Sequence, residues 1–307
     1  MIEVVPNVSE GRRPAVLEAL RTAVTGVTGA TLLDESADPS HNRSVFTIVG
    51  EADALREAVL RLMQVAVAHI DLRTHRGEHP RIGAVDVVPF IALDGATMAE
   101  CVSLAGDAAR AIAESFDVPV YLYEDAATRP ERRRLEVIRR GQFEGLATKM
   151  QTPGWEPDFG PLAPHPTAGA TVVGARRPLI AFNVDLDEAT LDVARHIAAA
   201  VRESSGGLPG VKALGLWLPH RGTAQISMNL TDYVRTPLVV AFDAVVRAAA
   251  DAGCRVRESE LIGLIPAAAL VGTTPEHLGL RAFDTSRILE ERIKLRVPSA
   301  GPSSRRG

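Results

Sequence analysis

The sequence predicts an α/β fold, α+β-like in its order, built as two α/β sandwich subdomains with mixed sheets. Segments typical of strands alternate with segments typical of helices in both halves of the chain. A length of 307 residues is large for one compact core and favours two subdomains. The order is not a regular β-α-β repeat, so parallel and antiparallel pairings are both expected. We place the subdomains at 1–177 and 178–297, followed by a disordered tail at 298–307.

In the first half, runs of apolar and β-branched residues predict strands at 2–5, 30–33, 43–49, 85–93 and 118–123. Apolar residues at helical spacing predict helices at 14–25, 52–70 and 97–115. Pro14 suits the first turn of its helix, where the missing N–H matters little, and Thr97 is the expected cap of the third helix. The basic segment 129–141 is predicted to be a helix whose arginines face solvent.

In the second half of the chain, segments typical of strands and of helices also alternate. Strands are predicted at 170–175 and 179–186, joined by a turn, then at 211–218 and 224–230 as a hairpin, and within 255–265. Helices are predicted at 188–203, 237–252 and 286–296. The glycines form neither a dinucleotide-binding fingerprint after a strand nor a P-loop, which argues against a nucleotide cofactor.

Between the two halves, the segment 152–169 interrupts the regular pattern. It contains five prolines and three glycines, yet it also carries Trp155 and Phe159, which a plain linker rarely needs. We interpret it as a loop that wraps a ligand and also links the two halves. Anchoring of the loop is the expected role of both aromatic residues.

Composition excludes several classes of protein. A net charge of −4 with scattered basic residues gives no sign of nucleic-acid binding. No apolar run reaches the roughly 20 residues of a membrane span. Two cysteines, Cys101 and Cys254, form no metal or disulfide pattern and fit a reducing compartment. We therefore expect a cytoplasmic protein.

The segment 73–81 concentrates chemically active side chains. It holds two histidines, a glutamate and three arginines directly before a predicted strand. Residues 75–79 match the H-x-x-E-H pattern of a zinc peptidase family, but that site needs both histidines on one helix face. Gly77 and Pro80 disfavour a helix here, so we expect a loop and no metal. A plain solvated loop is the other interpretation of this cluster.

Several longer segments together resemble one known family. They are residues 5–11, 41–47, 77–90, 117–123, 157–161, 174–183, 224–230 and 263–266, in that order along nearly the whole chain. On these motifs the chain resembles the formiminotransferase domain of the formimidoyltransferase-cyclodeaminase family. The resemblance implies transfer of a formimino group from N-formimidoylglutamate to tetrahydrofolate in histidine breakdown. It also implies two facing α/β subdomains around a folate tunnel, a homodimer, and no resident metal.

The resemblance assigns the family's catalytic histidine to His79, and we expect this single imidazole to act as a proton shuttle, first as base and then as acid. It assigns the folate-holding loop to Gly160, Pro161, Leu162, Ala163, Pro164, His165, Pro166, Thr167, Ala168 and Gly169, with a further folate contact at Gly210. The two glycines that bound the loop are expected to let the backbone approach a flat ring closely. Because the chain ends near 307, a separate cyclodeaminase is expected as a partner.

The sequence departs from the family where the animal enzymes carry an acidic residue and this chain has Ser36. A carboxylate there would orient the catalytic histidine, so Asp38 or Glu35 is expected to replace it, and Glu78 is a further candidate for this role. We expect His41 to be a hydrogen-bonding loop residue and His75 to be exposed.

Arg43 and Arg81 are candidates for the substrate carboxylates, because a guanidinium binds them with two parallel hydrogen bonds. Structural salt bridges are the alternative for both. Two other functions stay open: formyl transfer from N-formylglutamate to tetrahydrofolate, and folate binding without catalysis.

Overall fold

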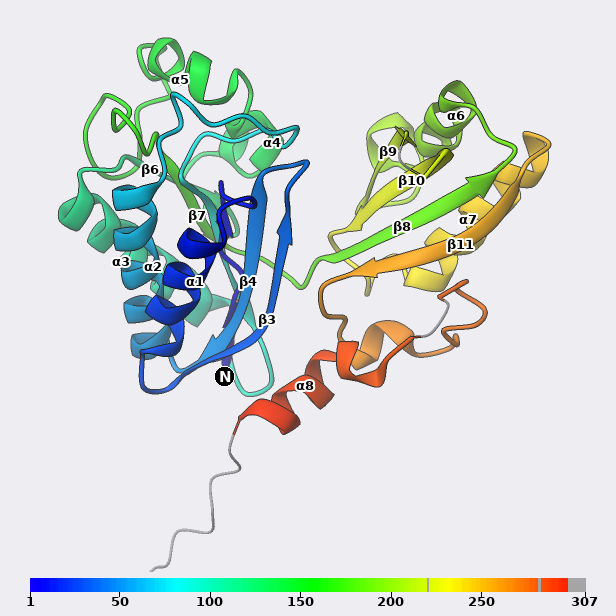
Figure 1. Cartoon of the computed structure of the whole chain (residues 1–307), viewed down its shortest axis with the longest axis horizontal. Coiled ribbons are helices and arrows are strands. Elements are labelled where there is room, and N and C mark those ends of the chain that lie inside the picture. Colours follow the sequence, from blue (N-terminus) through cyan, green and yellow to red (C-terminus); the bar gives the residue numbers. More distant parts are fainter. Residues whose placement is uncertain (220, 281–282, 298–307) are drawn as a thin grey trace, which may run out of the picture. The chain divides into compact units, whose positions relative to one another are not determined.

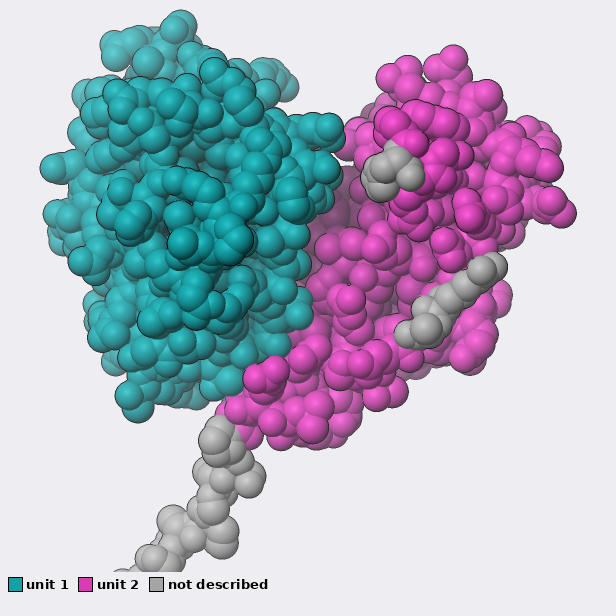
Figure 2. Space-filling model, viewed as in Figure 1, with its two compact units in different colours: residues 1–176 teal, residues 177–307 magenta. Residues whose placement is uncertain are grey.

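The computed structural model describes residues 1–219, 221–280 and 283–297. The chain forms two compact units, residues 1–176 and residues 177–307 (Figure 2). Each unit has a hydrophobic core of its own. The tail predicted to be disordered, 298–307, lies outside the described residues.

Unit 1 contains a mixed sheet of seven strands. These are β1 Ile2–Val4, β2 Asn7–Val8, β3 Ala30–Asp38, β4 Arg43–Gly50, β5 Val85–Ala92, β6 Val120–Glu124 and β7 Thr171–Ala175. β1 and β2 both lie between β4 and β5 in antiparallel pairing, whereas β7 runs parallel to β5 and to β6. β3 continues past its predicted end at residue 33 because it pairs with β4 as far as Asp38 opposite Arg43. Pairing with a neighbour thus extends a strand through polar residues.

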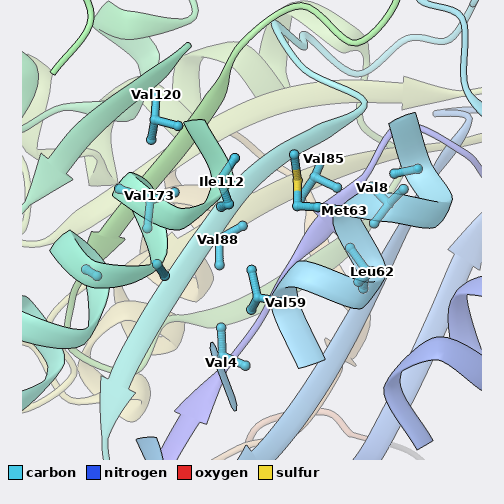
Figure 3. Packing of buried hydrophobic residues seen from close by; sticks show 14 of the residues in the cluster. Val4, Val8, Val59, Leu62, Met63, Val85, Val88, Ile112, Val120 and Val173 are labelled. Carbon is cyan, nitrogen blue, oxygen red and sulfur yellow. The ribbon is translucent and has the colours of Figure 1, made fainter. Parts of the chain in front are cut away.

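Three helices cover one face of this sheet: α1 Pro14–Thr25, α2 Ala52–His69 and α3 Met98–Phe116 (Figure 1). Each matches a predicted helix. α3 begins with a capping box in which Thr97 and Glu100 exchange side-chain and backbone hydrogen bonds, as the cap prediction requires. Val59 from α2 and Ile112 from α3 pack against Val88 of β5 in a core closed to solvent (Figure 3).

The other side of β6 and β7 is covered by short helices in place of the single one predicted at 129–141. They are the 3₁₀ turn η1 Pro130–Arg132, α4 Leu135–Ile138 and α5 Gln142–Met150. The prediction was wrong because Arg132 turns inward. It is 1% exposed, pairs with Asp158 at 3.0 Å and lies 5.2 Å from the centroid of the Tyr121 ring. Gly141, with φ of +89°, then separates α4 from α5.

Unit 2 is built on an antiparallel sheet in the order β11-β8-β10-β9. Its strands are β8 Ile180–Asp187, β9 Val211–Leu218, β10 Thr223–Leu230 and β11 Arg255–Ile262. Its helices are α6 Leu191–Val201, α7 Leu238–Asp251 and α8 Leu289–Arg296, with 3₁₀ turns η2 Glu203–Ser205, η3 Ala267–Leu270 and η4 Thr285–Arg287. α6 and α7 pack against the sheet and against each other. The two α/β units and the β9–β10 hairpin are confirmed, but a mixed sheet is found in unit 1 and not in unit 2.

The connection between the units differs from the predicted one. The segment 152–169 follows α5 and leads into β7, so both of its ends belong to unit 1. The chain instead passes between the units after Arg176. β7 and β8, which were expected to be joined by a turn, lie in different sheets. The prediction failed because prolines and glycines indicate irregular backbone, and irregular backbone occurs within a unit as well as between units. Among the described ranges, the helices lack the combination of length and apolarity that a bilayer-spanning segment needs.

Candidate functional site

The loop between α2 and β5 carries the two histidines that the sequence singled out. Residues 71–80 form turns and irregular backbone without a helix. The His75 side chain is buried, its Nε2 lies 2.9 Å from the Asn42 carbonyl oxygen, and its Nδ1 accepts a hydrogen bond from Arg81 at 3.2 Å. A ring nitrogen that faces a carbonyl must donate, so Nε2 carries the proton and the imidazole is neutral.

Burial accordingly lowers the pKa of His75. The expectation of an exposed His75 was wrong, because this ring is a structural link between two loops. The zinc peptidase interpretation also fails on this geometry. It requires a helix through 75–79, and both nitrogens of His75 are already engaged.

Three segments interlock around the turn between β3 and β4. Asn42, in the left-handed region at φ of +50°, accepts a hydrogen bond from the Gly11 N–H at 3.0 Å and donates to the Arg76 carbonyl at 3.0 Å. A Cβ on Gly77 would lie 2.1 Å from the His41 carbonyl oxygen, so only glycine lets these two loops approach so closely. The interlock brings the turn that bears His41 against the loop that bears His79.

His79 lies beside His41 in a positively charged environment. The two imidazole rings are arranged edge to face, with centroids 6.5 Å apart. Burial, and then the charges of Arg43 and Arg139, lower the pKa of His79 to about 2. The ring is therefore neutral at physiological pH, which is the state that can accept a proton.

Arg43 and Arg139 are the nearby cations. Burial, followed by the charge of Arg139, lowers the pKa of Arg43 to about 10. The Nε atoms of both arginines are shielded from solvent and have no hydrogen-bond partner among the described residues. Arg139 forms an ion pair with Asp86, whose other oxygen accepts the Ile82 N–H at 2.7 Å. Two shielded guanidinium groups with unused donors beside a neutral imidazole form a site suited to a carboxylate.

Sequence reasoning missed Arg139, since it stands in a run of basic residues that all looked solvated. The role of Arg139 becomes clear only from its buried partner in the folded structure. β5 supplies Asp86 as a buried partner at 2% exposure, and a buried carboxylate requires a cation.

The Arg81 guanidinium is hydrogen-bonded to other side chains of unit 1. It donates to both carboxylate oxygens of Glu144 at 2.7 and 2.9 Å, to Gln142 at 3.2 Å, and to the His75 ring. The side chain is buried at 7% exposure, and the hydrogen bond from Arg81 holds the pKa of Glu144 below its usual value. Of the two interpretations of Arg81, the geometry supports the structural salt bridge.

The carboxylates expected to orient His79 lie elsewhere. Asp38 accepts a hydrogen bond from His41 Nδ1 at 2.6 Å and from the backbone N–H groups of Ser40 and His41. Glu35 forms a two-point ion pair with Arg21 of α1 at 2.6 and 3.1 Å. Glu78 has an exposed side chain, and its backbone N–H donates to Ser40 at 3.3 Å. In the described residues, the Asp38 carboxylate thus orients His41 and not His79.

The predicted folate loop has two parts with different properties. Residues 165–169 form a tight hairpin in which His165 and Gly169 exchange backbone hydrogen bonds at 2.8 and 2.9 Å. The His165 ring accepts the Ala168 N–H at 3.0 Å, and Ala168 accepts from the Ala84 N–H at 2.9 Å. Ala168 and Gly169 are buried, so this part belongs to the fold. Residues 160–163 are exposed, with Leu162 at 62%, and form the part of the loop open to a ligand.

Trp155 and Phe159 anchor the approach to this loop, as expected. The Tyr121 hydroxyl donates to the Trp155 carbonyl at 2.7 Å, and Lys149 Nζ lies 3.8 Å from the centroid of the Trp155 ring. The Phe159 ring packs against the core of unit 1, and the Arg110 guanidinium carbon lies 5.0 Å from its centroid.

Gly169→Ala is expected to lower the free energy of unfolding by about 2–5 kcal/mol, measured by urea titration. Gly169 has φ of +72°, and a Cβ there would lie 2.1 Å from the Ile82 carbonyl oxygen. Gly95→Ala is the matched control, because Gly95 has φ of +79° and a Cβ there would meet no described atom within 4 Å. It should lose only the conformational part, about 1–2 kcal/mol. Equal losses in both variants would show that the close approach to Ile82 is unimportant. The expected role of Gly169 in admitting a flat ring stays a prediction.

Gly210 lies in unit 2, between η2 and β9, at φ of +72°. Its N–H donates to Glu203 at 3.1 Å, and its carbonyl accepts from the Thr231 N–H at 2.8 Å and from the Thr231 hydroxyl at 3.0 Å. These bonds account for its backbone conformation. Its contact with folate stays a prediction.

Comparison with known proteins places this geometry in context. Residues 1–176 match the family described as formiminotransferase domain, N-terminal subdomain, and residues 181–301 match the formiminotransferase domain. A glutamate formimidoyltransferase from Streptococcus pyogenes serotype M1 is 44% identical, covering 95% of this chain and 98% of its own. One from Thermoplasma acidophilum is 41% identical, covering 96% and 97%. A formimidoyltransferase-cyclodeaminase from Rattus norvegicus is 42% identical over 88% of this chain and 51% of its own length.

Proposed function

The chain belongs to the formiminotransferase family, and on that premise we propose that it moves the formimino group of N-formimidoyl-L-glutamate to tetrahydrofolate. The products are 5-formimidoyltetrahydrofolate and L-glutamate. The chain is then a one-carbon group transferase with tetrahydrofolate as its co-substrate. Relatives named glutamate formimidoyltransferase, similar over nearly the whole chain, support this function.

The structural observation that carries the proposal is the pair of shielded Nε donors, on Arg43 and Arg139, that have no hydrogen-bond partner among the described residues and lie near His79. The donor substrate has two carboxylates, and the reaction needs a base. Arg43 and Arg139 offer unused N–H donors for a carboxylate, while His79 is held in the form that accepts a proton. A bound anion would also offset the positive charge that depresses the pKa of His79.

The transfer proceeds by addition and elimination. N5 of tetrahydrofolate forms a bond to the formimino carbon, and the bond from that carbon to the glutamate nitrogen then breaks. One proton leaves N5 and one proton reaches the departing nitrogen. In the proposed mechanism His79 takes the proton from N5, a contribution of roughly 10²–10⁴-fold to the rate.

A two-donor assay tests the function against its rivals. Purified protein is given tetrahydrofolate with N-formimidoylglutamate and, separately, with N-formylglutamate, and the released glutamate is measured. Glutamate release from the formimidoyl donor supports the proposal. Faster release from the formyl donor would assign formyl transfer. Folate binding without release from either donor would assign a non-catalytic folate-binding protein.

Folate is expected to protect residues 160–167 from hydrogen exchange and from proteolysis, whereas N-formimidoylglutamate alone should protect them much less. Residues 160–163 are exposed in the structure, so ligand contact is what would shield them. Residues 168–169 are already buried and serve as the internal reference whose exchange should change little. If neither ligand changes exchange at 160–167, the folate site must lie elsewhere.

The remaining proposals concern the partner enzyme, the oligomeric state and the cellular location. The relatives from rat and mouse are named formimidoyltransferase-cyclodeaminase, and this chain spans about half their length, 51% in both. We propose that a cyclodeaminase acts on the product. A homodimer, a folate tunnel and a cytoplasmic location remain predictions from the family resemblance and the composition.

A further inference from the structure

His41 occupies a position that its expected role as a loop residue does not explain. It lies on the turn between β3 and β4, and its ring faces the His79 ring with centroids 6.5 Å apart. Its Nδ1 is 2.6 Å from the Asp38 carboxylate, which also accepts the His41 backbone N–H at 3.0 Å. Because Asp38 engages Nδ1, Nε2 is the ring nitrogen left for proton exchange.

We propose that His41, positioned by Asp38, is a second proton-transfer residue that protonates the departing glutamate nitrogen while His79 deprotonates N5 of tetrahydrofolate. The inference rests on the proposed formimino transfer and divides its two proton movements between two imidazoles.

The proton count balances without a further reactant. The bond from N5 to the formimino carbon forms, and the N5 proton passes to His79. The bond from that carbon to the glutamate nitrogen breaks, and His41 supplies the proton that this nitrogen takes up. His79 then holds one proton more and His41 one fewer than at the start. Return of a proton from His79 to His41 through water restores both.

The exposure of the two groups suits this division. The His41 side chain is 44% exposed and can exchange protons with solvent, whereas His79 is more enclosed. The charged groups around the pair are Asp38 of β3, Arg43 of β4 and Arg139 after α4. A positive charge on His41 adds to theirs in opposing a second proton on His79. When His41 carries the proton, His79 is therefore kept neutral, and the bound substrate carboxylate has to offset these positive charges before His79 accepts the N5 proton.

The hydrogen bonds around the Asp38 carboxyl group favour its ionised form. Burial alone would raise the pKa of its carboxyl group, but hydrogen bonds from the backbone and ring of His41 and from the Ser40 N–H outweigh burial and hold the pKa below its usual value. An ionised Asp38 keeps the His41 ring in one orientation and one tautomer.

The test compares His41→Gln and Asp38→Asn with wild type in the formimidoyl transfer assay across pH. His41→Gln should lower kcat by roughly 10²-fold and leave the KM of both substrates within about threefold. It should also lose the alkaline limb of the pH profile, because the variant no longer carries the group that donates the proton. Added imidazole should restore part of the rate. Asp38→Asn should lower kcat less and shift that limb.

His277→Gln is the matched control. His277 also pairs with a carboxylate, Asp243, at 2.9 Å, and its side chain is 53% exposed, but it lies in unit 2. It should keep wild-type kcat and pH profile.

Three results would overturn the inference. The first is a kcat within twofold of wild type for His41→Gln. The second is a lowered kcat with an unchanged pH profile and no rescue by imidazole, which assigns a structural role. The third is that wild type transfers nothing from N-formimidoylglutamate, which overturns the proposed function and this inference with it. The first two leave the proposed function standing.

Discussion

His79→Ala is expected to lower kcat by roughly 10²–10⁴-fold while folate affinity stays within about twofold of wild type. The variant removes the proposed acceptor of the N5 proton and leaves in place the arginines that are proposed to bind the substrate carboxylates. Steady-state kinetics measures the first quantity, and equilibrium titration with tetrahydrofolate measures the second. Since the pKa of His79 in the free protein is about 2, lowering the pH from 8 to 5 should not inactivate the free enzyme through this residue.

His69→Ala is the control for this experiment, because His69 is an exposed residue at the end of α2 in the same unit. It should behave as wild type. Near wild-type turnover in His79→Ala would show that the family's catalytic histidine has been placed on the wrong residue.

Arg43→Met is expected to separate substrate binding from stability. The apparent affinity for N-formimidoylglutamate should fall by about 1.5–3 kcal/mol, a factor of roughly 10–150. The free energy of unfolding should stay unchanged or rise by about 1 kcal/mol, because Met removes a shielded donor that has no partner in the described part of the chain. Urea titration and substrate kinetics on the same preparation measure both quantities.

Arg81→Met is the matched control, and its expected effects are the reverse. Arg81 donates to Glu144, Gln142 and His75, so its removal should lower the free energy of unfolding by about 1–3 kcal/mol. Substrate affinity in the folded fraction should change little. If both variants were destabilised alike and Arg43→Met bound substrate normally, Arg43 would be a structural residue and the anion site would lie elsewhere.

The sequence predicted most elements of both units because their signals are local. Helical spacing of apolar residues and the cap at Thr97 are properties of short windows, and the structure has the corresponding helices. The segment 129–141 failed because its conformation depends on Asp158, a partner distant in the sequence. The sequence does not reveal that Asp158 is the partner of Arg132, so the burial of Arg132 could not be predicted.

The candidate site shows the same limit. Sequence motifs assigned the catalytic role to His79, which stays a prediction, but they could not separate the roles of Arg43 and Arg81, which both stand in recognisable segments. The difference is one of hydrogen bonding, since Glu144 saturates Arg81 while the Nε of Arg43 has no partner among the described residues. The pairing of Asp38 with His41 likewise follows from a turn whose shape is set by Asn42 and Gly77.

The course of the chain between its units bears on how the protein is synthesised. All seven strands of the first sheet, and the helices that pack on it, are encoded before residue 177. The ribosome therefore delivers everything unit 1 needs before β8 has emerged, including β7, which joins β5 to β6. Domains generally fold as units during synthesis, N-terminal first. The loop bearing His79 and its arginines can thus be assembled on the nascent chain, independently of the second half of the message.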